Sequence, residues 1–133
     1  MLLDTIPGVG LQTAAIVASE LGSPERFESA RQAAAYAGLV PRHRKCHRKS
    51  GTSVRGNPQM SKVGNARLRR AMYFPAMSAL RCNAAVKAFG NRLKERGKEK
   101  MVVLGAAMRK LLHICYGVLK SGRPFDASLH PGT

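Results

Sequence analysis

Residues 101–119 read MVVLGAAMRKLLHICYGVL, and this apolar stretch decides the fold of the 133-residue chain. Its hydrophobic side chains recur every three or four residues, so they fall on one face of an α-helix that must be buried. Polar residues interrupt the apolar run, which argues against a membrane span. We therefore predict a long core helix near the C-terminus, with an apolar stripe made of Met101, Leu104, Met108, Leu111, Leu112, Cys115, Val118 and Leu119.

Shorter helices are expected on the N-terminal side. Residues 11–21 form an Ala-rich apolar run that Gly22 and Pro24 bring to an end. Residues 30–37 carry a small apolar face and precede Gly38 and Pro41. The segment 42–59 has no periodicity and is predicted to be a loop.

Two more helices are expected between this loop and the core helix. Ser61 is the predicted N-cap of a helix that reaches Asn83 and kinks at Pro75, because proline removes one backbone donor. A short basic helix follows over residues 84–96 and ends at Gly97. No strand alternation is present. The predicted fold class is all-α, with one compact helical domain over residues 1–126 and an irregular tail at 127–133.

The charge of the chain points to a polyanionic partner. Lys plus Arg number 23 against 7 Asp plus Glu, which gives a net charge of +16. Between residues 29 and 94 there are fifteen Lys or Arg and no Asp or Glu. Nucleic acid is the leading candidate partner, and a site built from clustered carboxylates is excluded from that window.

The densest charge lies in RHRKCHRKSGTSVRG, residues 42–56. Such a run binds phosphate whatever the base sequence, with affinity that falls steeply as salt rises. The alternative is a solvated loop without a partner. The cations concerned are Arg42, Arg44, Lys45, Arg48 and Lys49.

Cysteine and histidine do not favour a metal site or a disulfide framework. His43, Cys46 and His47 lie together, but no second Cys/His pair is near to complete four zinc ligands. The three cysteines are widely spaced, and no cleavable apolar leader precedes them, so we expect a reduced, cytoplasmic setting.

The turn IPGVG, residues 6–10, precedes an Ala-rich helix and looks like the hairpin of a helix-hairpin-helix unit. In such a unit, glycines such as Gly8 and Gly10 let backbone N–H groups approach a phosphate. The alternative is a turn that only connects two elements, and the residues alone leave both open.

Several hydroxyl groups are candidate nucleophiles. Ser50 lies between Lys49 and Gly51, so a phosphate could approach it while cations stabilise the developing charge. Ser-Gly is also a commonplace loop pair, and Thr52, Ser53 and Ser61 carry hydroxyls as well. Tyr73 and Tyr116 would suit a tyrosine recombinase, but both fall within helices, where core or boundary packing is the favoured interpretation.

Blocks in a fixed order carry a family resemblance. The blocks IPGVG, AAYAGLVP, SGTSVRG, MSKVGNARLRRAMYFPAMSAL, AVKAF, RLKERGK and LGAAMRKLLHICYGVLKSGRPFD extend from Ile6 to Asp126. This order resembles the C-terminal domain of the DEDD transposases of the insertion-sequence 110/116/902 family, which are related to pilin-gene invertases. The chain departs from the family in residues 42–49, which are more numerous and more basic than in relatives.

The resemblance implies a division of labour. Relatives carry an N-terminal RuvC-like domain with an Asp-Glu-Asp-Asp magnesium site, which is absent here, so this chain needs no cofactor of its own and should be inactive alone. The family's nucleophilic serine matches Ser50, which would form a covalent link to cut DNA. Expected partners are DNA, a structured guide RNA and further copies of the full-length protein, in the cytoplasm at the nucleoid, with no membrane.

The nucleic-acid contacts expected on these grounds combine the hairpin glycines, the basic loop and the cations that follow it. The alternative function is a noncatalytic nucleic-acid-binding helix-hairpin-helix module. The expected contact residues are Gly8, Gly10, Arg42, Arg44, Lys45, Arg48, Lys49, Gly51, Arg55, Lys62, Arg67, Arg69 and Arg70.

Overall fold

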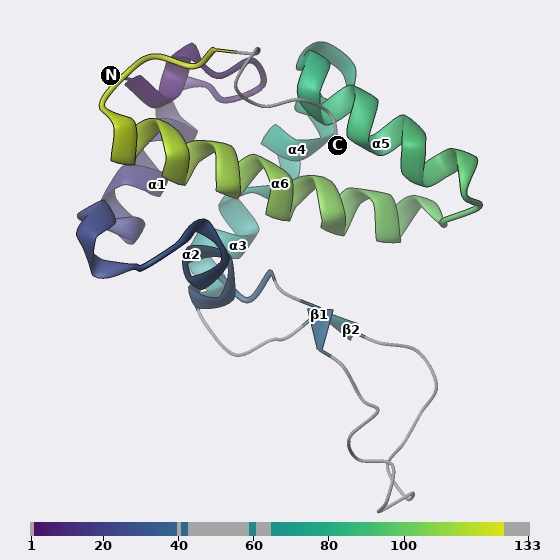
Figure 1. Cartoon of the computed structure of the whole chain (residues 1–133), viewed down its shortest axis with the longest axis horizontal. Helices are drawn as coiled ribbons and strands as arrows, with labels where there is room; N and C mark the ends of the chain where they lie inside the picture. Colours follow the sequence, from purple (N-terminus) through teal and green to yellow (C-terminus); the bar gives the residue numbers. More distant parts are fainter. Residues whose placement is uncertain (1, 40, 43–58, 61–64, 127–133) are drawn as a thin grey trace, which may run out of the picture.

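The structure is a computed structural model that describes residues 2–39, 41–42, 59–60 and 65–126. The all-α prediction is confirmed, because helices form nearly all of the regular structure in these ranges (Figure 1). In chain order the elements are the 3-10 helix η1 (Leu2–Thr5), α1 (Leu11–Leu21), the 3-10 helix η2 (Pro24–Arg26), α2 (Ala30–Tyr36), β1 (Pro41–Arg42), β2 (Gln59–Met60), α3 (Ala66–Ala71), α4 (Tyr73–Cys82), α5 (Ala84–Glu95) and α6 (Lys100–Ser121).

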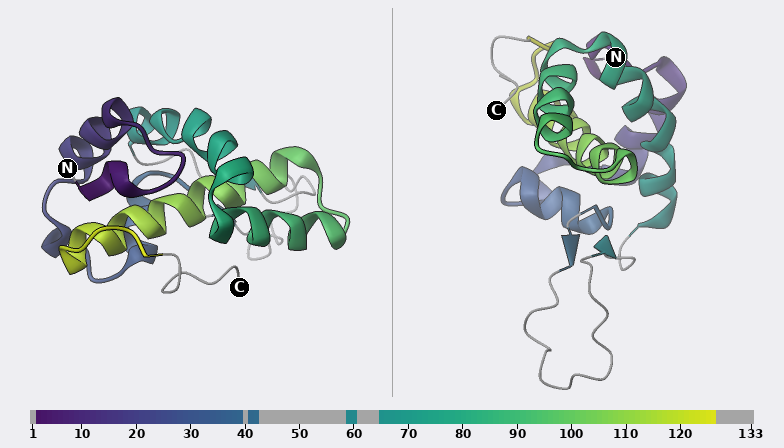
Figure 2. Two further views of the ribbon diagram at one scale, coloured as in Figure 1. Left: turned by 90° about the horizontal axis from the view of Figure 1, so that it is seen from above. Right: turned by 90° about the vertical axis from the view of Figure 1, so that its right-hand side faces the viewer.

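Helix α6 is the core of the fold, and it packs against α2, α4 and α5. Figure 1 and the right-hand view of Figure 2 place it between α2 on one side and α5 on the other. Leu104, Leu111 and Leu112 are buried as predicted. Tyr116 is buried too, and its hydroxyl donates a hydrogen bond to the Phe27 carbonyl at 3.1 Å, so its role is packing.

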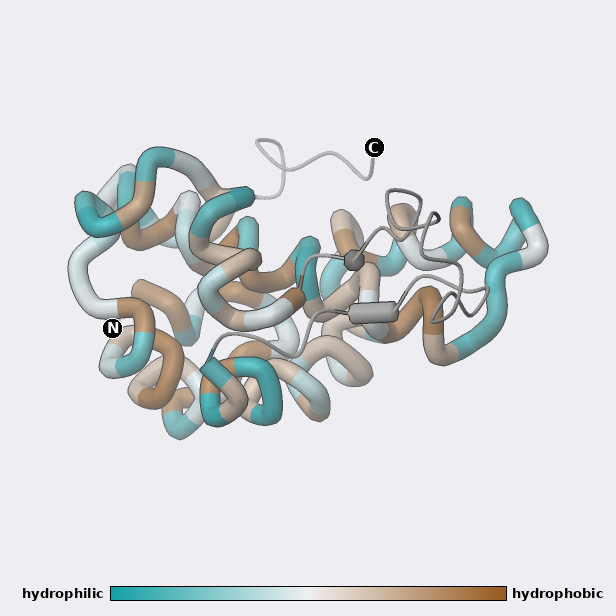
Figure 3. The backbone as a smooth tube through the Cα atoms, turned by 90° about the horizontal axis from the view of Figure 1, so that it is seen from below, coloured by the Kyte–Doolittle hydropathy of each residue, from teal (hydrophilic) through white to brown (hydrophobic). Residues whose placement is uncertain are grey.

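The predicted stripe on α6 is wrong at its first member. Met101 is 67% exposed, because it lies in the first turn of α6, where the chain has only just left α5. Burial begins one turn later, at Val103 and Leu104. Figure 3 shows that the turn between α5 and α6 is hydrophilic.

Length and composition alone would allow α6 to cross a membrane. However, 56% of its most apolar window is buried inside the fold. The packing of α6 against three other helices therefore accounts for its apolar residues, as the sequence analysis expected.

The single helix predicted between Ser61 and Asn83 is two helices. The N-cap prediction was wrong: the cap is Asn65, whose side-chain oxygen accepts a hydrogen bond from the Leu68 N–H at 2.9 Å. Helix α3 ends at Ala71 and α4 begins at Tyr73, with Met72 as the cap between them. The break lies just before Pro75, whose ring would clash with the carbonyl four residues earlier in a continuous helix.

Helices α4 and α5 meet at Asn83, the one buried polar residue in the described ranges. Its side-chain oxygen accepts hydrogen bonds from the N–H groups of Ala85 and Val86, which begin α5. Gly90 lets α5 approach α4 closely, because a Cβ there would lie 2.5 Å from the Leu80 side chain.

Two short strands accompany the helices. β1 and β2 pair antiparallel, with Pro41 opposite Met60 and Arg42 opposite Gln59. Each strand has two residues, which is too short for side-chain alternation to show in the sequence. The two ends of the predicted loop are therefore held together.

Candidate nucleic-acid interface

The segment that contains Ser50 starts and ends at one place on the helical body. Its two ends meet in the β1–β2 pair, beside α2 and α3 (Figure 1). After β2, the Asn65 N–H donates a hydrogen bond to the Tyr36 carbonyl at 2.6 Å, which attaches this part of the chain to the end of α2. Before β1, the Leu39 N–H donates a hydrogen bond to the Ala34 carbonyl in α2 at 2.9 Å.

Asn65 is the hub of this attachment, although the sequence analysis did not select it. Its side-chain amide donates to a Glu20 carboxylate oxygen at 2.7 Å and to the Tyr36 hydroxyl at 3.2 Å. One residue therefore caps α3 and joins it to α1 and α2. The signal that could have revealed it is an Asn directly before a helix-forming run.

Glu20 brings a carboxylate to the edge of this basic region. The hydrogen bond from Asn65 lowers its pKa below the usual value, and the Arg67 guanidinium, 3.3 Å away, lowers it further. The Arg67 side chain is 74% exposed, and an exposed ion pair of this kind contributes little. Most of the Arg67 side chain is therefore open to solvent despite its pairing with Glu20.

The other predicted arginines of α3 divide into two kinds. Arg69 is half-buried and donates to the Ala37 carbonyl at 3.3 Å, so part of its role is to tie α3 to α2. Arg70 is exposed. It lines an open groove of about 490 Å³ together with Ala15, Ile16, Ser19, Glu20, Arg67 and Ala71.

The two predicted hairpin glycines have different surroundings. Gly8 has φ +101°, and a Cβ there would lie 3.0 Å from the backbone of Ala79 in α4. Close helix packing thus accounts for Gly8. Gly10 has open space around it and is the exposed N-cap of α1, without a side-chain cap, so its end of α1 is free to meet an anion.

The remaining predicted contacts lie partly outside the described residues. For Arg42 the structure gives the backbone, in β1. The predicted zinc candidates His43, Cys46 and His47 lie outside the described ranges. So do Arg44, Lys45, Arg48, Lys49, Ser50, Gly51, Arg55 and Lys62.

A second group of cations lies on α6. The pKa of His113 is lowered, first by burial and then by the charges of Arg109, Lys110 and Arg31. In the part of the chain that the structure describes, the buried Arg109 Nε and His113 Nε2 atoms have no hydrogen-bond partner. His113 is therefore held neutral near pH 7 within a basic environment.

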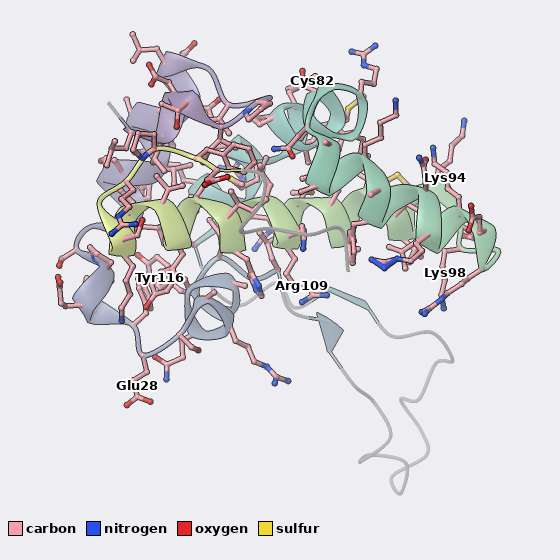
Figure 4. All side chains as sticks on the ribbon, turned by 45° about the horizontal axis from the view of Figure 1, so that its top comes forward. Glu28, Cys82, Lys94, Lys98, Arg109 and Tyr116 are labelled. Atoms are coloured by element: carbon pink, nitrogen blue, oxygen red, sulfur yellow. The ribbon has the colours of Figure 1, made fainter. Side chains whose placement is uncertain are left out.

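Charge is also distributed along the length of the molecule. Figure 4 shows Lys94 and Lys98 at one end, where α5 turns into α6, and Glu28 at the other. Among the described residues, no group of three or more His, Cys, Asp or Glu side chains could hold a metal ion.

Comparison with known proteins identifies the family to which the chain belongs. Residues 1–91 match the Transposase IS116/IS110/IS902 family. The match covers more than half of the chain, and the chain belongs to this family.

The relatives are longer than this chain. It is 38% identical over 130 residues to a pilin gene-inverting protein of Moraxella bovis, covering 97% of this chain and 39% of that protein. It is 30% identical over 131 residues to the insertion element IS110 uncharacterized 43.6 kDa protein of Streptomyces coelicolor, covering 98% of this chain and 31% of that protein. The chain thus spans about two fifths or less of the length of these relatives.

Proposed function

We propose that this chain is the part of a DNA transposase that grips DNA and supplies Ser50 as the nucleophile for strand cleavage and exchange. The observation that carries the proposal is the attachment of the Ser50 segment. The β1–β2 pair holds its ends beside α3, which presents Arg67 and Arg70. A phosphate bound by these arginines would lie near the base of the segment that carries the serine.

Strand cleavage needs a nucleophile, groups that transfer protons, and cations that stabilise the charge on the phosphate. The Ser50 Oγ attacks phosphorus, its proton passes to a base, and the bond from phosphorus to the leaving sugar oxygen breaks while that oxygen gains a proton. Cations around the phosphate stabilise the charge on its oxygens. The window 29–94 supplies cations and no carboxylate, so in this proposal acids come from a RuvC-like domain elsewhere in the full-length protein.

Binding can be tested on the chain itself through its salt dependence. Each phosphate contact adds roughly 0.9 to the slope of log affinity against log salt for duplex DNA. Neutralising Arg44, Lys45, Arg48 and Lys49 to Gln should reduce the slope by up to roughly 3.6. The matched control neutralises Lys87, Lys94, Lys98 and Lys100, which are exposed on or beside α5, and should change the slope less. An unchanged slope in the first variant would remove the 42–49 run from the interface.

Catalysis can be tested in a chimaera. This chain replaces the matching 130-residue segment of the Moraxella bovis pilin gene-inverting protein. Ser50→Ala should keep DNA affinity and lose covalent protein–DNA adducts. Thr52→Ala and Ser53→Ala should have mild effects, because their hydroxyls present another trajectory to phosphorus. Adducts that persist in Ser50→Ala would contradict the assignment.

A guide RNA and self-association are part of the same proposal. The net charge of +16 fits a polyanionic partner, and none of the described helices has evident base-reading features, which fits a partner that brings its own sequence information. A matched RNA that supports strand exchange in the chimaera, where a scrambled RNA does not, would test this.

A further inference from the structure

The described part of the chain exposes six large hydrophobic side chains, and three of them lie together on α4. Tyr73 is 38% exposed, Phe74 73% and Met77 43%. Tyr73 lies at the boundary of the core, in agreement with the prediction of core or boundary packing. Phe74 is the more exposed of the two rings.

Arginines bracket these apolar side chains on the same face. Tyr73, Phe74, Met77 and Arg81 follow one another at intervals of four residues or less, so they share one side of α4. Arg70 precedes them by one turn, in α3. We call these five residues the aromatic face. Arg70 and Arg81 are exposed, and neither has an ion-pair partner within residues 2–39, 41–42, 59–60 and 65–126.

The two rings are arranged as a preformed platform. Tyr73 and Phe74 meet edge to face, with centroids 5.2 Å apart and planes at 84°. This contact restrains both rings before any partner binds. Phe74 keeps a ring face open to solvent, since it is 73% exposed.

We propose that the aromatic face binds unpaired nucleotides, with a base stacked on Phe74 and the flanking phosphates held by Arg70 and Arg81. The charge on both sides favours this occupant over a protein surface. The face lies inside the window without Asp or Glu, and it spans about 16 Å along the helices, which accommodates a few nucleotides. Exposed aromatic rings between cations are the usual platform for single strands.

This inference rests on the proposed nucleic-acid binding and is independent of Ser50 chemistry. Strand exchange requires unpaired DNA, and the aromatic face would hold a strand after it leaves its duplex. Helix α3 (Ala66–Ala71), capped by Asn65, leads from the return of the β1–β2 pair to α4.

The experiment measures affinity of the whole chain for three probes: a 12-nucleotide DNA strand with 2-aminopurine at its centre, the same sequence as RNA, and the DNA duplex. Phe74→Ala should weaken single-strand binding by between about 5-fold and about 150-fold, while duplex affinity changes less than about 2-fold. The quenching of 2-aminopurine on binding should disappear. Comparing the DNA and RNA strands identifies which strand the face prefers.

Two control variants separate stacking from other roles. Met101→Ala removes an equally exposed apolar side chain from α6 and should change nothing. Phe74→Leu keeps apolar bulk without a ring and should still lose the quenching. Full single-strand affinity and quenching in Phe74→Leu would overturn the proposal, as would equal losses on duplex and single strand. A dimer in sedimentation that Phe74→Ala dissociates would assign the face to a second copy and also overturn it. If wild-type chain bound no probe, the failure would belong to the proposed function instead.

Discussion

Substituting the two hairpin glycines separately tests whether Gly8 is there for packing or for phosphate. Gly8→Ala places a Cβ at φ +101°, which costs about 1–3 kcal/mol for a non-glycine residue. The same Cβ meets three atoms of Ala79 at 3.0 Å, two of them backbone atoms, and overpacking adds roughly 1–3 kcal/mol. The lower entropy of the unfolded alanine chain returns about 0.4–1 kcal/mol. These terms give a net loss of about 1–6 kcal/mol, with a midpoint near 3 kcal/mol.

The assay is thermal unfolding followed by circular dichroism. A chain of 133 residues unfolds with an entropy of roughly 2.1 cal/mol/K per residue, so 1 kcal/mol corresponds to about 4 °C. Gly8→Ala should lower Tm by about 4–24 °C, with about 12 °C at the midpoint. Gly10→Ala is the matched control, because Gly10 has φ −86° and nothing within 4 Å of an added Cβ. Its cost at the N-cap is about 1 kcal/mol or less. A Gly8→Ala variant with unchanged Tm and weakened DNA binding would refute the packing account and restore Gly8 as a phosphate contact.

Two further perturbations test the core and its electrostatics. Leu111→Ala should cost roughly 2–5 kcal/mol in denaturant unfolding, because Leu111 is fully buried in α6; tolerance of this change would mean that α6 packs differently. The folded-state pKa of His113 is lowered, so the unfolded chain binds a proton first and stability should fall as pH drops below about 6.5. His113→Gln should flatten this decline below about pH 6.5, and an equally steep decline in that variant would exclude His113 as its source.

The sequence predicted the long-range architecture better than its junctions. Periodicity located α6 and α1 because apolar spacing directly reflects burial. The sequence prediction placed the N-cap of α3 four residues early, at Ser61. Both Ser and Asn are good N-cap residues, and only tertiary contacts decide between them. Asn65 is chosen by its bonds to Glu20 and Tyr36, which lie more than 25 residues away in sequence.

The candidate site was only partly predictable for a similar reason. Charge density identified the basic region, including Arg67 and Arg70, because it is a property of composition. The exposure of a side chain cannot be derived from composition. Phe74 and Met77 follow the same spacing as core residues, and only the packing of α4 shows which side is left uncovered. Gly8 looked like a phosphate contact because glycine serves close approach to a ligand and to another helix equally well.

The most direct test of the central claim is to identify the residue that becomes bonded to DNA. Adducts formed by the chimaera are digested with nuclease and trypsin, and the peptide that retains a nucleotide is sequenced by mass spectrometry. Lys49 and Arg55 are tryptic sites, so Ser50, Thr52 and Ser53 lie on one short peptide, SGTSVR, and fragmentation distinguishes them. We predict that the nucleotide is on Ser50. A nucleotide on Ser53, Ser61 or a tyrosine would contradict the assignment of the nucleophile.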